Sequence, residues 1–179
     1  MSTILLPTHG GYRRLYSFQK AEIIFDATVY FTRRFFRPDD RTIDQMVQAA
    51  RSGKQNIAEA SMASGTSKEM EIKLTNVARA SLEEVLIDYE DFLRIRGFCL
   101  WGVKHPYTER LANPSYETFR KGIENDSSEI CANVIIDLIK ITTYLLNGQI
   151  RRLEQDFLRE GGLRERMSQA RRDSRKANP

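Results

Sequence analysis

Apolar side chains recur at steps of three and four residues along most of this sequence, and that spacing places them on one face of an α-helix. The first such stretch, residues 12–36, contains no glycine or proline and ends before Pro38, whose ring disfavours helical geometry at the preceding residue. A second stretch begins after Asp39 or Asp40, either of which can cap a helix, and continues to about Ser61. The pattern therefore predicts two long amphipathic helices.

A third helical stretch starts at Thr66 or Ser67, which can cap its first turn, and continues to about Arg96, where the next residue is a glycine. The periodicity then breaks over residues 98–125, which contain several turn residues and five aromatic side chains. This segment is predicted to be an inserted connector that packs on the helices or lines an interface. Short helical turns are expected within it, around residues 108–111 and 115–123.

The fourth helical stretch begins near Asp126, extends to Phe157 and ends at two consecutive glycines, residues 161–162. Its other side is also apolar, with Ile136, Ile139 and Leu146 away from the main stripe, and a helix that is apolar nearly all round must be buried on every side. We therefore expect that either the connector or another subunit covers it.

Helices of this length can lie alongside one another over most of their extent. The expected fold class is all-α, an up-and-down antiparallel four-helix bundle with the connector inserted between its third and fourth helices. The expected domain organisation is one bundle domain, residues 1–163 with the connector at 98–125, followed by a basic C-terminal tail, residues 164–179.

Composition excludes several classes of protein. A chain of 179 residues with 41% hydrophobic and 29% charged residues suits one folded domain rather than a disordered segment. No apolar stretch reaches the roughly 20 residues of a membrane span, and the first ten residues lack a secretion signal, so a cytoplasmic location is expected. The two cysteines, Cys99 and Cys131, and the two histidines, His9 and His105, are not spaced as metal ligands or redox pairs. We expect no metal site, no cofactor and no enzymatic activity.

The net charge of +4 is distributed unevenly, because residues 1–41 carry +3, residues 164–179 carry +4 and the middle carries −3. Basic extremities suit a polyanionic partner, although each cluster alone can equally be a solvated helix end. Arginine-rich segments neutralise phosphates without reading sequence. The candidate nucleic-acid-binding residues are Arg13, Arg14, Arg33, Arg34, Arg37, Arg41, Arg51, Lys54, Arg151, Arg152, Arg164, Arg166, Arg171, Arg172, Arg175 and Lys176.

Two further groups of residues are singled out. Ser52, Asn56 and Glu59 share one helix face at i, i+4 and i+7, and we expect them to form a structural polar network that fixes the register of two helices. The Gly53-Lys54 pair lacks the second glycine and the preceding strand of a phosphate-binding loop. The connector supplies four candidate residues for a protein interaction, which are Trp101, Tyr107, Tyr116 and Phe119.

Several segments resemble one bacterial family of four-helix bundles. They are residues 17–21 (SFQKA), 44–52 (DQMVQAARS), 56–59 (NIAE) and 75–84 (TNVARASLEE). This family includes the proteins encoded in ribosomal-RNA intervening sequences and the accessory variability determinants of diversity-generating retroelements. Residues 132–134, 144–146, 149–150, 153–154, 157 and 161–167 look like the subgroup that carries a four helix bundle suffix region. The resemblance implies an up-down protomer, commonly assembled as a pentamer with a basic surface, without catalytic residues; the accessory determinants bind nucleic acid and a reverse transcriptase.

Two functions are consistent with these observations. The preferred hypothesis is a non-enzymatic homo-oligomer that binds nucleic acid, RNA rather than DNA, as an accessory to a reverse transcriptase or to an rRNA-associated element. The resemblance implies that this oligomer is a pentamer. The alternative is a protein-interaction scaffold in which the aromatic connector docks a protein partner and the charges keep the assembly soluble.

Overall fold

The computed structural model describes residues 10–102 and 116–177, and these residues form helices and no β-strand. The predicted all-α class is therefore confirmed for this part of the chain. The elements are η1 (Tyr12–Arg14), α1 (Tyr16–Phe35), α2 (Thr42–Ala63), α3 (Lys68–Ile95), α4 (Tyr116–Ile123), α5 (Ser128–Glu160) and α6 (Leu163–Ala177).

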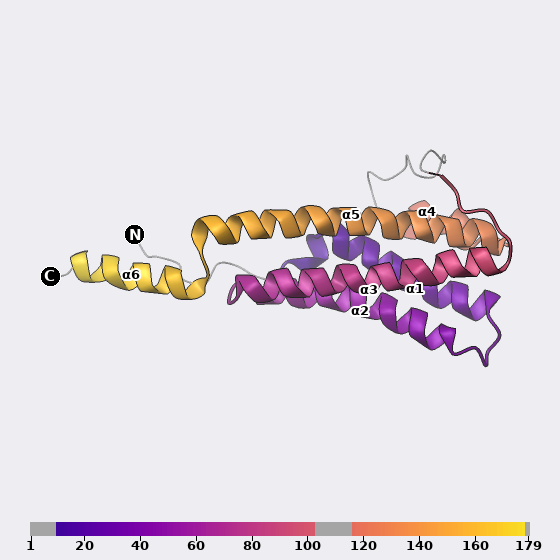
Figure 1. The fold of residues 1–179 in the computed structure, drawn as a ribbon, viewed down its shortest axis with the longest axis horizontal. Helices are drawn as coiled ribbons and strands as arrows, with labels where there is room; N and C mark the ends of the chain where they lie inside the picture. The colour runs from indigo at the N-terminus through magenta and orange to yellow at the C-terminus, as the bar shows by residue number, and fades with distance from the viewer. Residues whose placement is uncertain (1–9, 103–115, 178–179) are drawn as a thin grey trace.

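The long helices α1, α2, α3 and α5 lie alongside one another and form the body of the molecule (Figure 1). α1 packs against α2 and α5, and α3 packs against the same two helices. The short helix α4 lies on α5, and η1 contacts the start of α1 and the end of α2. α6 projects from one end of this body (Figure 1). None of the described helices is long and apolar enough to span a lipid bilayer.

Several helix ends lie where local sequence signals predicted them. The Ser67 hydroxyl accepts a hydrogen bond from the backbone N–H of Met70 at 3.1 Å and caps α3. Gly97 follows the end of α3 with φ of +68°, a backbone conformation that glycine adopts without steric cost. Ser127 caps α5 in the same way as Ser67 caps α3, and Gly161, also at φ +68°, ends α5.

The first predicted helix is divided in two. Leu15 is extended, with φ −73° and ψ 124°, and it separates η1 from α1. The break is a tertiary effect, because the backbone N–H of Gly10 donates to the carbonyl of Ser61 at 3.1 Å and draws this segment onto the end of α2. The ring of Tyr12 then packs edge-on against Phe18, with centroids 4.7 Å apart.

The expected C-terminal tail is helical over most of its length. α6 begins directly after the two glycines, and the Glu165 carboxylate accepts a hydrogen bond from the backbone N–H of Gly162 at 2.9 Å. Leu163, Met167 and Ala170 are half-buried and follow one another at helical spacing, so α6 has a narrow apolar side.

The first half of α5 is covered within the chain. Residues 131–136 are all buried, and α4 lies directly upon them. A side chain at Gly122 of α4 would stand 2.7 Å from Val134, so glycine is needed for this approach. Burial raises the pKa of the Cys131 thiol to about 12, and its sulfur donates to the carbonyl of Ile123 at 2.8 Å. The connector, one of the two expected covers, lies on this half of α5. The expected burial on every side is wrong for the second half, where Tyr144 and Leu158 are exposed.

Candidate nucleic-acid interface

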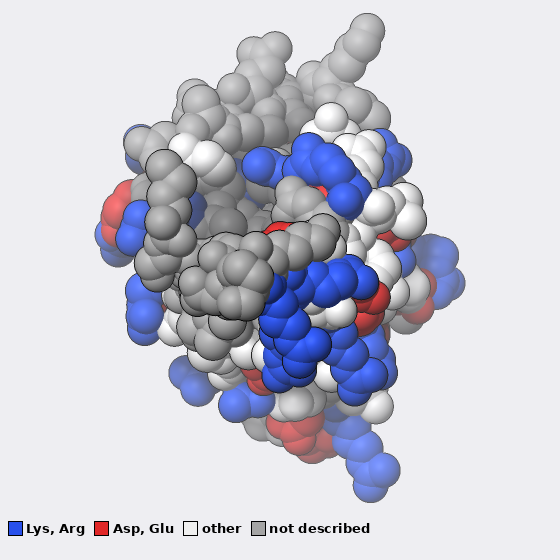
Figure 2. All heavy atoms as spheres, turned by 90° about the vertical axis from the view of Figure 1, so that its left-hand side faces the viewer, with Lys and Arg blue, Asp and Glu red and all other residues white. Residues whose placement is uncertain are grey.

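Four of the candidate arginines lie at the end of the body from which α6 projects. Arg13 and Arg14 form η1, while Arg151 and Arg152 lie in the second half of α5, and all four are exposed. The Ser17 hydroxyl donates to the Gln149 side chain at 3.3 Å and so places the start of α1 beside this part of α5. Figure 2 looks onto this end and shows Lys and Arg side chains adjoining one another, with fewer acids among them.

α6 adds the densest positive charge to the same end. The segment 163–177 carries six basic and two acidic residues, a net charge of +4. Arg164, Arg171, Arg172 and Arg175 are exposed, and Arg172 donates to Gln169 at 3.0 Å. The side chains of Arg166 and Lys176 lie outside the described part of the structure.

The cluster at residues 33–41 lies at the opposite end of the body. Some of its arginines are paired with acidic side chains and others are not. Arg34 forms an ion pair with Asp126, and this hydrogen bond raises the pKa of its guanidinium. Arg37 pairs with Asp39 at 3.3 Å, whereas Arg33 and Arg41 are exposed and form no ion pair with the described residues. Only part of this cluster therefore offers uncompensated charge.

The two basic candidates in the middle of α2, Arg51 and Lys54, differ in how exposed their charges are. Arg51 is exposed. The ammonium group of Lys54 lies 4.2 Å from the centroid of the Phe25 ring, a cation–π contact between α2 and α1. Lys54 is half-buried, and its charge takes part in packing.

The expected polar network forms in part. The Ser52 and Ser81 hydroxyls lie 3.0 Å apart and join α2 to α3. The Asn56 amide donates to the Ser52 carbonyl at 2.9 Å and to its hydroxyl at 3.2 Å. Glu59 is exposed and has no hydrogen bond or ion pair with the described residues, and the network instead includes Ser81, which sequence reasoning missed. Gly53 lies beside it, where a Cβ atom would stand 2.7 Å from Leu82, so glycine permits the close contact of these helices.

The described part of the connector is attached to α5 by a buried amide. Asn133, 1% exposed, donates to the carbonyls of Cys99 and Glu129, both at 2.9 Å, and accepts from the backbone N–H of Trp101 at 2.8 Å. Sequence reasoning missed this role of Asn133. The signal that could have indicated it is a single amide side chain within an apolar helical segment. Of the four aromatic candidates, Trp101 is half-buried against the core, Phe119 is 6% exposed and lies within the core, and Tyr107 lies outside the described residues.

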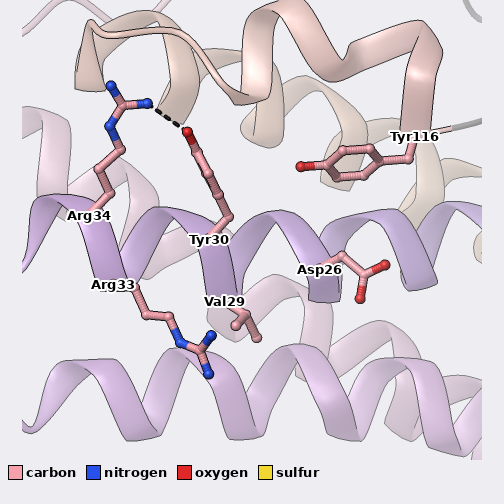
Figure 3. Close-up of a pocket in the computed structure, with 6 residues that line it drawn as sticks. All are labelled: Asp26, Val29, Tyr30, Arg33, Arg34 and Tyr116. Carbon is pink, nitrogen blue, oxygen red and sulfur yellow. Dashed lines mark hydrogen bonds between the residues drawn. The ribbon is translucent and has the colours of Figure 1, made fainter.

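The fourth aromatic candidate, Tyr116, lines a groove of about 550 Å³ on the outer side of α1 (Figure 3). The other residues of this groove are Asp26, Val29, Tyr30, Arg33 and Arg34. The hydroxyl of Tyr116 donates to the Glu124 carboxylate at 3.4 Å, and burial together with that carboxylate raises the pKa of Tyr116 to about 12. Burial also raises the pKa of Asp26, against the opposing effect of Lys54.

One buried cation lies outside all these groups. Lys20 of α1 is 3% exposed, and its ammonium nitrogen has no hydrogen-bond partner among the described residues. Burial lowers the pKa of this amine below 10.5. Such a group costs free energy of folding because it loses its hydration without gaining a partner.

We expect Lys20→Met to raise the free energy of unfolding at pH 7 by about 1–3 kcal/mol, the cost of an unsatisfied buried polar group. Between the lowered pKa and 10.5 the unfolded chain binds more protons at this site than the folded chain, so the stability of the wild type rises with pH there. The advantage of the variant over the wild type should therefore shrink toward pH 10. Urea unfolding at pH 7 and pH 10 measures both effects.

Lys73→Met is the matched control, because Lys73 is exposed on α3 and keeps its hydration in the folded chain, so its replacement should change the free energy of unfolding at pH 7 little. A Lys20→Met variant that is less stable than the wild type at pH 7 would contradict the prediction, since it would mean that the amine has a stabilising partner.

Comparisons with protein-family models, with curated proteins and with solved structures find no match for this chain. Within the described residues, no three His, Cys, Asp or Glu side chains lie together in a way that could hold a metal ion.

Proposed function

We propose that this chain is a non-enzymatic nucleic-acid-binding protein that acts on RNA rather than DNA. The observation that carries the proposal is helix α6, with a net charge of +4, which projects from the end of the body where η1 and the second half of α5 carry exposed arginines. Charges on a projecting helix can reach phosphates without displacing the body of the protein. Guanidinium groups bind phosphate oxygens in bidentate fashion, and single-stranded RNA lets such segments follow its backbone.

The proposal includes an up-and-down four-helix bundle protomer that assembles as a homo-oligomer. The pairwise packing of the four long helices supports the bundle. Four apolar side chains on the outer sides of α3 and α5 remain more than half exposed, and they support contact with other copies: Ile87, Ile95, Tyr144 and Leu158. Two parts of the proposal rest on the family resemblance alone. They are the pentameric state and the role as an accessory to a reverse transcriptase or to an rRNA-associated element. In a ring, repeated weak basic patches would add to one another in avidity.

The salt dependence of RNA binding tests the proposed function. We expect the affinity for a labelled single-stranded RNA to fall steeply between 50 and 200 mM salt, by about 50-fold if four phosphates are neutralised. Fluorescence anisotropy over this range measures the slope. An affinity that is flat over the range, or no binding at 50 mM salt, would overturn the proposal. Equal affinity for DNA of the same sequence would overturn the preference for RNA.

A further inference from the structure

The groove on α1 contains two tyrosine rings that the protein itself holds in place. The Tyr30 hydroxyl accepts a hydrogen bond from Arg34 at 2.6 Å, and that guanidinium is fixed by Asp126 and by the carbonyl of Glu124. The Tyr116 hydroxyl donates to the carboxylate of the same Glu124. Both rings lie on the same side of α1 (Figure 3). The groove therefore has two aromatic rings whose positions do not depend on a ligand.

Opposite charges flank these rings along α1. Asp26 and Arg33 are seven residues apart, two helical turns, which separates them by about 10 Å along the helix axis. Neither side chain has a hydrogen bond or ion pair with the described residues. In Figure 3 the Asp26 carboxylate lies near the Tyr116 ring, while Arg33 extends away from both tyrosines. The groove thus offers two aromatic rings, a hydrogen-bond acceptor at one end and a cation at the other.

A nucleotide has the complementary arrangement. Its base stacks on aromatic rings, its base edge carries N–H donors, and its phosphate lies on the far side of the sugar. A carboxylate only accepts hydrogen bonds. Guanine presents two adjacent N–H donors on its pairing edge, whereas adenine and cytosine present one donor beside a ring-nitrogen acceptor, which a carboxylate repels.

We propose that this groove is a guanine-nucleotide subsite, in which the base stacks on Tyr30 and Tyr116 and Asp26 accepts from its pairing edge. Arg33, an exposed side chain, turns from the orientation in Figure 3 toward the tyrosines and binds the phosphate. The subsite rests on the proposed function, since it would select guanine within a bound single-stranded RNA. The affinity of α6 for phosphates carries no base preference, so the groove is the part of the molecule that would supply one.

The test uses the full-length chain and 5′-GMP, 5′-AMP and 5′-CMP as probes in amide-resolved NMR titrations. GMP should shift the amides of α1 and α4 and bind at least tenfold more tightly than CMP or AMP. Asp26→Asn replaces one acceptor oxygen by a donor and should abolish the preference for GMP. Arg33→Gln should weaken GMP binding and leave guanosine, which lacks the phosphate, unchanged. Tyr116→Leu should weaken all three nucleotides about tenfold, the loss expected for one stacking partner.

Lys73→Gln is the matched control, because Lys73 is an exposed cation on α3 that does not line the groove. It should bind GMP as the wild type does. Equal binding of GMP and CMP, or no shift at α1 and α4, would overturn the subsite. Asp26 and Arg33 are surface residues, so their variants test it even if Tyr116→Leu fails to fold.

Binding of oligouridine measured in parallel separates this inference from the function on which it rests. Salt-dependent RNA binding without a GMP response in the groove would refute the subsite and leave the proposed function standing. A GMP response in the groove without RNA binding would refute the proposed function and leave a free-nucleotide site.

Discussion

Replacing Arg171, Arg172 and Arg175 of α6 with glutamine is expected to weaken RNA binding by about 100-fold at 0.1 M salt. Each phosphate that a cation neutralises on a single strand contributes about 0.7 to the slope of log affinity against log salt, which is about fivefold in affinity at this concentration. The three guanidinium groups are exposed. The triple variant should also lower the magnitude of the salt slope by about 2. Anisotropy titrations at several salt concentrations measure both quantities.

The control variant removes arginines whose charges already have partners. Arg94 pairs with Asp91 at 2.7 Å, and Arg120 pairs with Glu124 at 2.8 Å, so neither presents a full charge to a polyanion. Replacing both with glutamine should leave the salt slope close to that of the wild type. Glutamine and arginine have similar helix propensities, so α6 should keep its helical content, which circular dichroism verifies. Wild-type affinity in the triple variant would exclude α6 as a phosphate-binding element.

Composition alone could not predict which arginines are free to bind phosphate. Clusters of arginine are visible in the sequence, but whether each charge is free depends on a partner that can be far away. Asp126 lies 92 residues from Arg34, and nothing near Arg34 indicates that pairing. The groove was missed for the same reason, since Tyr30 and Tyr116 come together only when α4 lies across α1 and α5.

The fold was more predictable because its signals are local. The capping hydroxyl of Ser67 and the glycines at 97 and 161 mark helix ends within a few residues, and the apolar periodicity identifies the buried faces. The break at Leu15 has no local signal, since it depends on the contact of Gly10 with Ser61. Helical structure in α6 was not predicted because its apolar side is narrow, with half-buried Leu163 and Met167.

Tyr89→Ala is expected to lower the free energy of unfolding by about 3–5 kcal/mol, the range for truncating a large core aromatic side chain. Tyr89 of α3 is fully buried, and its ring meets Phe31 of α1 edge-on at 4.9 Å between centroids. The Phe31 ring also meets Phe92 at 4.8 Å, so one aromatic cluster joins α1 to α3. Alanine at position 89 would leave a cavity in the middle of this cluster, which dense packing prevents from closing.

Tyr89→Phe separates the ring from the hydroxyl. Burial raises the pKa of Tyr89 well above its usual value, so the hydroxyl keeps its proton and donates to Thr28 at 3.2 Å. The Thr28 hydroxyl donates in turn to the carbonyl of Ile24 at 2.7 Å, and that bond survives the substitution. We therefore expect Tyr89→Phe to lower the free energy of unfolding by only about 1 kcal/mol, the net contribution of one hydrogen bond. Urea unfolding of both variants tests the assignment, and equal losses in the two would mean that the hydroxyl, rather than the packing of the ring, holds α1 and α3 together.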